Sequence, residues 1–510
     1  MTADVTILIV VIAYLAAMMI VGLLARGRDP SKKDYYLAGR RLPYWVIAFS
    51  MNATGESAWL LLGLSGLGYV VGVQAFWVVI GETIGIWLSW SLVAKRLNAA
   101  ARASDAVTVP DVLADRLGDP LRLIRILSVV IILVMVAVYV AAQMLATGKA
   151  FETFLGWPYV AGVIVGGVVT VTYTSFGGFR GVAYTDTAQA LLMVFAVTAV
   201  PIVGLVAIGG FTGLAQALSA LDPALLSPLQ ASPASIVAIL SIASALAIGL
   251  PFLGVPQLLV RYIATRDAAE ISKARTISVS VIFLLGFGAV STGLVGRALY
   301  PGLADGETIM PTLSEALFPP FVTGLLVAAV LSAVMSTVSS LLNLASSAVV
   351  SDLYHQFVRP DADSRAVARL GVWVTAVLGV LGCVIAFNQQ GLIFNFVLFA
   401  WAGLGAAFGP VVLCVLWWPR TTWQGAVAGM VGGFSITVVW ISVFKARFYD
   451  LYEMIPGFIG GLVIVVAVSL ATATAPTATS RRFENKQALE GGAGAGRVDG
   501  MKGTEDGWTT

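Results

Sequence analysis

Charge, histidine and cysteine are scarce in this chain. Only 11% of its 510 residues are charged, 58% are hydrophobic, and the net charge is +3. This composition excludes a soluble protein of this size, and so few scattered charges argue against nucleic-acid binding. A single histidine, His355, which we expect in a polar loop, argues against a histidine-ligated catalytic metal. Cys383 and Cys414 lie in apolar runs and are interpreted as core residues, not as a disulfide or metal pair.

Motifs of common enzymes and signalling modules are also missing. The sequence has no GxxxxGK[ST], no GxSxG and no pair of metal-binding histidines, so we do not expect an enzyme. Residues 476–510 are Gly-rich and charged, and predict a disordered cytoplasmic tail. At about 35 residues the tail is too short for a folded signalling domain, which argues against a sensor.

Long apolar runs make up most of the sequence, and the mean hydropathy of the whole chain is +0.91. A membrane-spanning helix needs about 20 apolar residues, and the breaks between the runs predict thirteen spans in a lipid bilayer. The first run lacks a basic flank and a cleavage site, so we interpret it as a retained helix. The predicted spans are residues 5–25, 43–67, 70–94, 121–150, 157–177, 186–209, 234–262, 275–299, 318–349, 366–387, 391–417, 423–444 and 454–473.

Basic residues predict the orientation of these spans. Of the 30 Lys and Arg residues, four (Lys149, Arg297, Lys445 and Arg447) follow even-numbered spans, and the other 26 lie on the opposite side. Because cytoplasmic loops are enriched in basic residues, the N-terminus is predicted outside and the C-terminus in the cytoplasm. We expect a multi-pass protein of the cell (inner) membrane.

Two predicted spans contain helix-breaking sequences. Span 2 is interrupted by the small and hydroxylated run Ala53–Ser57, and span 7 by Gly249–Pro256, which holds two prolines. The breaks lie five spans apart, which suggests five-helix repeats over 43–209 and 234–417 within a transmembrane domain of 1–475. Paired breaks mark the midplane site of secondary transporters with inverted repeats. Two unrelated kinks are the alternative.

Two carboxylates stand inside apolar spans. Glu56 lies in the break of span 2, and Glu82 lies in span 3. A charge at the bilayer centre costs about 2.5–3.5 kcal/mol on insertion scales, so such residues usually face a cavity and serve a function. Glu56 could attract sodium or a solute ammonium group. Glu82 could bond the unwound part of span 2 or titrate as a proton site, and a protonated structural acid is the alternative.

Span 9 carries a stripe of small and hydroxylated residues. Ala333, Ser336, Thr337 and Ser340 share one helix face at i, i+3, i+4 and i+7. Hydroxyls and carbonyls suit a hard cation such as sodium, but small-residue stripes also pack membrane helices together. Asp186 opens span 6, where it is a second candidate for ion binding or simply an N-cap.

Several strings together resemble the sodium/solute symporter family, and within it the bacterial sodium/proline symporters. The resemblance covers residues 5–473 and implies a LeuT-like fold of inverted five-helix repeats. The supporting strings are Ser57–Gly63, Thr185–Gln189, Ala333–Ser340, Ser351–Tyr354 and Ala400–Pro410.

This resemblance implies positions for the ligands. Sodium is expected between spans 2 and 9, on the carbonyls of Ala53, Glu56 and Ala333 and the hydroxyls of Ser336 and Thr337. A second sodium site matches Asp186, Ser336, Ser339 and Ser340. The solute contacts are expected at Ser57, Ala58, Trp59, Tyr139, Gln143, Phe252 and Pro256.

The chain departs from the proline symporters at the proposed pocket. They carry an aspartate where this chain has Gly55, Trp and Tyr where it has Ile248 and Phe252, and an apolar residue where it has Glu82. We therefore expect a sodium-coupled symporter of a small organic solute, with proline or a related amino acid first. The alternative is a sodium- or proton-coupled symporter of a monocarboxylate or other organic solute, with Glu56 and Glu82 as coupling carboxylates. The oligomeric state stays open.

Overall fold

The structure is a computed structural model that describes residues 3–24, 32–229, 235–359, 362, 364–387 and 393–473. Every regular element in these ranges is helical, and their only β-pairing is an isolated bridge between Leu42 and Thr265. The predicted all-α architecture is confirmed. The predicted tail lies outside the described residues.

Nineteen α-helices make up the described chain. They are α1 Ala3–Leu24, α2 Lys32–Leu37, α3 Tyr44–Ala58, α4 Ser65–Val71, α5 Phe76–Leu88, α6 Lys95–Ala103, α7 Val109–Leu117, α8 Leu123–Leu155, α9 Tyr159–Ala207, α10 Gly210–Leu221, α11 Ile236–Ala247, α12 Pro256–Ala264, α13 Ile271–Leu299, α14 Ile309–Leu317, α15 Pro320–Ser347, α16 Ser364–Ala386, α17 Ile393–Trp417, α18 Trp423–Val439 and α19 Met454–Thr472.

Eleven helical segments of the described chain are long and apolar enough to cross a membrane. One of them, Tyr44–Ala103, has 60 residues, which is enough for two crossings of about 20 residues each. Tyr159–Ser175 is apolar but shorter. Eleven segments make this a multi-pass membrane protein, and the number of thirteen crossings stays a prediction.

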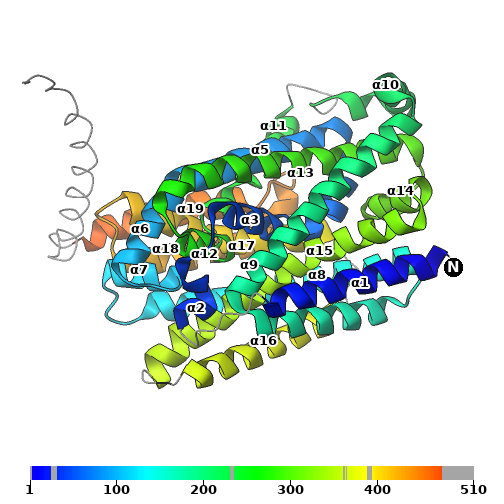
Figure 1. The fold of residues 1–510 in the computed structure, drawn as a ribbon. Helices are drawn as coiled ribbons and strands as arrows, with labels where there is room; N and C mark the ends of the chain where they lie inside the picture. Colours follow the sequence, from blue (N-terminus) through cyan, green and yellow to red (C-terminus); the bar gives the residue numbers. More distant parts are fainter. Residues whose placement is uncertain are drawn as a thin grey trace, which may run out of the picture.

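Burial separates central helices from peripheral ones. In an apolar 18-residue stretch of each segment, 94% of the residues are buried in Pro320–Val358 and 83% in Ile393–Trp417, whereas only 22% are buried in Trp423–Arg447. The central helix α15 contacts α1, α3, α8 and α9. In Figure 1 the short helices α3 and α12 lie within the bundle, with α5 and α13 on one side and α8 and α15 on the other. The interrupted helices therefore meet the most buried part of the molecule.

The helix α9 contains both predicted spans 5 and 6. Its one residue with non-helical backbone angles is Gly178, at φ 56° and ψ −170°, and the helix resumes at once. Asp186 therefore lies two turns inside a helix, and its interpretation as an N-cap is wrong.

The single histidine and the two cysteines lie in helices. Both Cys383 and Cys414 are free; Cys414 is buried as expected of a core thiol, whereas Cys383 is half-buried and packs against the edge of the core. His355 belongs to the π-helical segment η9 (Ala348–Val358), which continues from α15. The expected polar loop is wrong because the helix runs about two turns past the predicted end of span 9.

Candidate ion and solute site

The first interrupted helix breaks at one residue. Ser57, the second-last residue of α3, has φ 39° and ψ −171°, just before the π-helical segment η2 (Trp59–Leu64). The freed amide of Ala58 donates to the side-chain oxygen of Gln143 on α8, at 3.1 Å. Residues 53–56 stay helical, so the break is narrower than the predicted Ala53–Ser57.

Helix α15 joins α3 through the predicted sodium ligands. The hydroxyl of Ser336 donates to the carbonyls of Ala53, at 2.8 Å, and of Ala333, at 3.2 Å. The hydroxyl of Thr337 donates to the carbonyl of Thr54, at 3.0 Å. These groups are buried, and together they form a compact cluster of uncharged oxygens, the ligand type that a hard cation prefers.

Glu56 is the member of the predicted set that differs. Its carbonyl accepts a hydrogen bond from the amide of Trp59, inside the break. The carbonyl of Thr54, and not that of Glu56, contacts α15, because it lies on the helix face that meets Thr337. Sequence reasoning missed Thr54, although its place one residue after Ala53 made it a natural candidate.

The predicted second sodium site contains a guanidinium group. Nη2 of Arg261, on α12, lies 2.8 Å from Oδ2 of Asp186 and 2.7 Å from the hydroxyl of Ser340. It also donates to Thr54 at 2.5 Å, and Nε of Arg261 donates to Ser50 at 3.0 Å. The ion pair is fully buried. Asp186 and Ser340 thus lie together as predicted, but they surround the guanidinium group of Arg261.

Ser339 lies apart from this arginine. Its hydroxyl donates to the carbonyl of Ser336, at 3.0 Å. Sequence reasoning missed Arg261, which it counted among the basic residues of a cytoplasmic loop. The signal was available, since Arg261 falls within the predicted limits of span 7 and a charge inside a span usually has a function.

The second interrupted helix is a short 3-10 segment between two α-helices. After α11 ends, η6 (Leu250–Leu253) and Gly254 lead into α12. The carbonyl of Ile248 accepts from the indole of Trp401, at 3.1 Å, and that of Phe252 accepts from the hydroxyl of Ser89, at 2.6 Å. These donors from α17 and η4 (Ser89–Ala94) satisfy carbonyls freed by the break, as a membrane interior requires.

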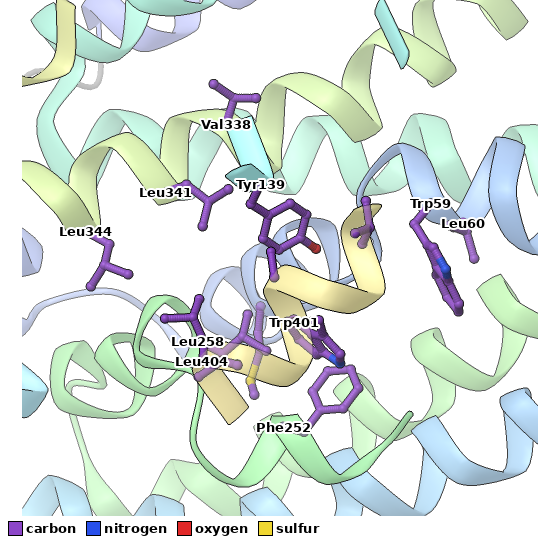
Figure 2. Packing of buried hydrophobic residues seen from close by; sticks show 14 of the residues in the cluster. Trp59, Leu60, Tyr139, Phe252, Leu258, Val338, Leu341, Leu344, Trp401 and Leu404 are labelled. Carbon is purple, nitrogen blue, oxygen red and sulfur yellow. The ribbon is translucent and has the colours of Figure 1, made fainter. Parts of the chain in front are cut away.

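Most predicted solute contacts gather between the two breaks. The hydroxyls of Tyr139 and Ser57 share a hydrogen bond, and the ring of Phe252 lies against Gly55, where an added Cβ would come within 3.3 Å. Phe252 also meets Trp401 edge to face, with ring centroids 5.1 Å apart. Figure 2 shows Tyr139, Phe252 and Trp401 around the same region. All are buried, so the pocket is closed to solvent in this conformation.

The remaining predicted contacts lie at the margins. Trp59 stacks on Phe394 of α17, with centroids 5.6 Å apart, and stands away from Tyr139 in Figure 2. Pro256 is buried as the first residue of α12, a position where the missing amide costs nothing. Sequence reasoning missed Phe394 and the contact role of Trp401.

The carboxylates of Glu56 and Glu82 are both buried, and each acts electrostatically on the other. Neither oxygen of the Glu56 carboxylate has a hydrogen-bond partner among the described residues, and the same is true of Oε2 of Glu82. Helix α5 carries Glu82 against the second break, because Gly81 and Gly85 touch the backbone of Leu246 and Gly249. The two acids therefore lie between the interrupted helices.

A charged cluster closes each end of the bundle. At one end Lys149 pairs with Glu307, at 2.9 Å, and Glu307 also accepts from the amides of Ile393 and Phe394 at the start of α17. At the other end Arg125 pairs with Asp111. Sequence reasoning missed both clusters, although only the first joins distant segments: Lys149 and Glu307 are 158 residues apart, and Arg125 and Asp111 are 14 apart.

Comparisons with known proteins agree with this geometry. A family model described as the sodium:solute symporter family matches residues 35–433. The high-affinity proline transporter PutP of Bacillus subtilis (strain 168) is 38% identical over 476 residues, 92% of this chain and 99% of that protein. The sodium/proline symporter of Escherichia coli (strain K12) is 35% identical over 484 residues, 93% of this chain and 95% of that protein.

Solved structures share the fold. A Na+-coupled sialic acid symporter in a substrate-bound outward-open state matches with a TM-score of 0.76, at 20% identity over 92% of this chain and 98% of that one. A nucleobase-cation-symport-1 family transporter in a closed conformation matches with a TM-score of 0.57, at 14% identity over 90% of this chain and 99% of that one.

An all-helical membrane bundle, two interrupted helices and a buried oxygen cluster between the first of them and α15 define a cation-coupled secondary transporter. The chain belongs to the sodium:solute symporter family. The predicted family and LeuT-like fold are confirmed, and sodium is the coupling ion of this family.

Proposed function

We propose that this protein is a sodium/proline symporter of the cell membrane, which uses the sodium gradient to import proline or a related small amino acid. Relatives at 35–38% identity across nearly their whole length carry the names of proline transporters. We further propose the orientation with the N-terminus outside, on the distribution of basic residues.

The observation that carries the proposal is the contact between α3 and α15. Ser336 and Thr337 donate to the carbonyls of Ala53 and Thr54. A sodium ion between these groups would bind the carbonyl oxygens and the lone pairs of both hydroxyls, and so tie α3 to α15 beside the Ser57 break. Each oxygen is already within hydrogen-bond reach of its neighbour, so the site needs little rearrangement.

Sodium and solute would favour each other through this tie. Sodium fixes the segment that leads to Ser57, which in turn fixes Ala58 against Gln143. The solute then meets a preorganised pocket, and thermodynamic linkage requires it to tighten sodium binding by the same factor. When the cytoplasmic side opens, α15 moves from α3 and sodium is released.

A second sodium ion at Asp186 would compete with Arg261. The guanidinium already neutralises Asp186 and bonds Ser340, so a second ion requires Arg261 to move away. We propose a single sodium ion in the conformation described here.

The test is uptake by purified protein in proteoliposomes. We expect labelled L-proline to accumulate under an inward sodium gradient, and not under an equal potassium gradient. Uptake driven by a pH gradient in sodium-free buffer would instead establish proton coupling. Sodium-dependent uptake of pyruvate but not of proline would favour the alternative of a monocarboxylate symporter, for which the Glu56 and Glu82 pair gives no support.

A further inference from the structure

Among the residues that the structure describes, no ion pair joins the acids Glu56 and Glu82 to a cation. Their exposed fractions are 0% and 4%. Three of their four oxygens lack a hydrogen-bond partner among the described residues. The nearby cation Arg261 is committed to Asp186. A buried carboxylate without compensation is strongly unfavourable, so this pair calls for a ligand.

The position of the pair is that of the solute. Glu56 directly precedes the broken residue Ser57, and Glu82 lies where α5 packs against the second break. The hydroxyl of Tyr139 feels the charge of both acids and bonds Ser57. Two carboxylates, the Tyr139 hydroxyl and both interrupted helices thus converge on the predicted pocket.

A buried donor without a partner completes the surroundings. Nε2 of Gln143 has no acceptor among the described residues, although Oε1 of the same amide accepts from Ala58. The predicted pocket therefore offers acceptors at Glu56 and Glu82 and a donor at Gln143, as a zwitterion requires.

Charge balance points the same way. One sodium ion at the Ala53 carbonyl, one helical turn before Glu56, together with a zwitterionic solute would leave one net negative charge at the two acids, because the ammonium group offsets the solute's own carboxylate. A monocarboxylate without an amine would leave two net negative charges. A quaternary amine would bring the charge but no N–H donor for the unpartnered oxygens.

We propose that Glu56 and Glu82 bind the protonated amine of the solute, while Gln143 faces its carboxylate. This rests on the proposed function and narrows it: the solute is an amino acid with a primary or secondary amine that donates hydrogen bonds.

Matched ligands test the proposal on the unmodified protein. In saturating sodium, purified full-length protein is titrated with L-proline, with tetrahydrofuran-2-carboxylate, whose ring oxygen replaces the amine, and with N,N-dimethylproline. L-Alanine and lactate form a second pair. We expect L-proline to bind at least 100-fold more tightly than tetrahydrofuran-2-carboxylate and N,N-dimethylproline. We expect L-alanine to bind at least 100-fold more tightly than lactate. Equal binding of proline and tetrahydrofuran-2-carboxylate would overturn the proposal.

A variant separates the amine subsite from the sodium site. Glu82→Gln is expected to raise the Kd of the amino acid at least 10-fold and to leave the sodium concentration for half-maximal binding unchanged. Glu152→Gln, at an exposed position of α8, serves as the control and should change neither value. An unchanged Kd in Glu82→Gln overturns the proposal.

The two proposals fail in different ways. Sodium-driven uptake of lactate or pyruvate that does not depend on Glu82 overturns amine recognition and leaves symport intact. The absence of sodium-dependent binding for every amino and organic acid tested overturns both.

Discussion

The first interrupted helix is held by side chains, and the second is held mainly by close backbone packing. At the first, Ser336, Thr337 and Gln143 bond the backbone around Ser57. At the second, an added Cβ on Gly249 would collide with the carbonyl of Gly81, and one on Gly254 would collide with Gly409 of α17. Indole and hydroxyl donors satisfy only single carbonyls there.

This difference suggests different roles for the two breaks. Hydroxyl groups can turn from a carbonyl to an ion, so the contacts of the first break are exchangeable. Backbone atoms packed against each other cannot replace these contacts with contacts to an ion. The second break is therefore rigid and moves only together with its neighbours α5 and α17. We therefore propose that the ion site belongs to the first break, and that the second shapes the pocket and transmits motion.

Arg261 joins the two regions, and its loss should have the largest effect. It lies on α12, after the second break, and bonds Ser50, Thr54 and Asp186. Arg261→Gln leaves Asp186 buried without its partner, which should lower the free energy of unfolding by about 3–5 kcal/mol. We expect a large fall in the thermal unfolding temperature and loss of uptake. The double variant Arg261→Gln/Asp186→Asn should be more stable than Arg261→Gln alone, and equal instability would contradict the pair.

The next effect tests the backbone contact of the second break. Gly249→Ala places a methyl group against the carbonyl of Gly81, and overpacking of this kind costs about 1–3 kcal/mol. We expect lower thermal stability, with the sodium concentration for half-maximal uptake unchanged in the folded fraction. Gly302→Ala, where an added Cβ meets nothing within 4 Å, is the control. A shift in sodium dependence would show that the second break also holds the ion.

The reciprocal change belongs to the first break. Ser336→Ala and Thr337→Ala each remove one expected sodium ligand and one hydrogen bond to α3. We expect each to raise the sodium concentration for half-maximal uptake about 10-fold, equal to about 1.4 kcal/mol, with a small effect on folding. Ser347→Ala, whose hydroxyl bonds only its own helix, is the control. Unchanged sodium-dependent uptake in both variants would show that the site assignment is wrong.

How far the sequence predicted the site depends on the range of each contact. The Ser336 and Thr337 face follows from helical spacing within one turn, and the structure places both hydroxyls on α3. Arg261 and Asp186 are 75 residues apart and meet only because α12 restarts after an irregular segment, which no local pattern specifies. Gly55 was expected to belong to the break, but it stays helical and instead admits the ring of Phe252.

Glu56→Gln probes the charge beside the first break. The carboxylate has no hydrogen-bond partner among the described residues, so an amide of equal shape should not lower the unfolding temperature. The lost negative charge one turn after Ala53 should weaken sodium activation, by about 5-fold, or about 1 kcal/mol. Sodium titration of uptake, compared with thermal unfolding, checks this difference. An unchanged sodium dependence would show that the charge of Glu56 does not act on the sodium site.

The smallest effect concerns the strain at Ser57. Its φ of 39° with ψ of −171° falls where glycine is favoured and other residues carry about 1–3 kcal/mol of strain. Ser57→Gly removes that strain but also the hydroxyl that bonds Tyr139 and accepts from the amide of Trp59, at 3.1 Å. Hydrogen bonds of this kind contribute about 1 kcal/mol each, so the two effects nearly cancel and the unfolding temperature should change little. Ser57→Ala keeps the strain and loses the same bonds, so it should be less stable than Ser57→Gly by about 1 kcal/mol or more. Equal stability of the two variants would mean that the backbone relaxes at this residue. The first break would then be as free of strain as the second, because the described residues 248–256 of the second break include no positive φ.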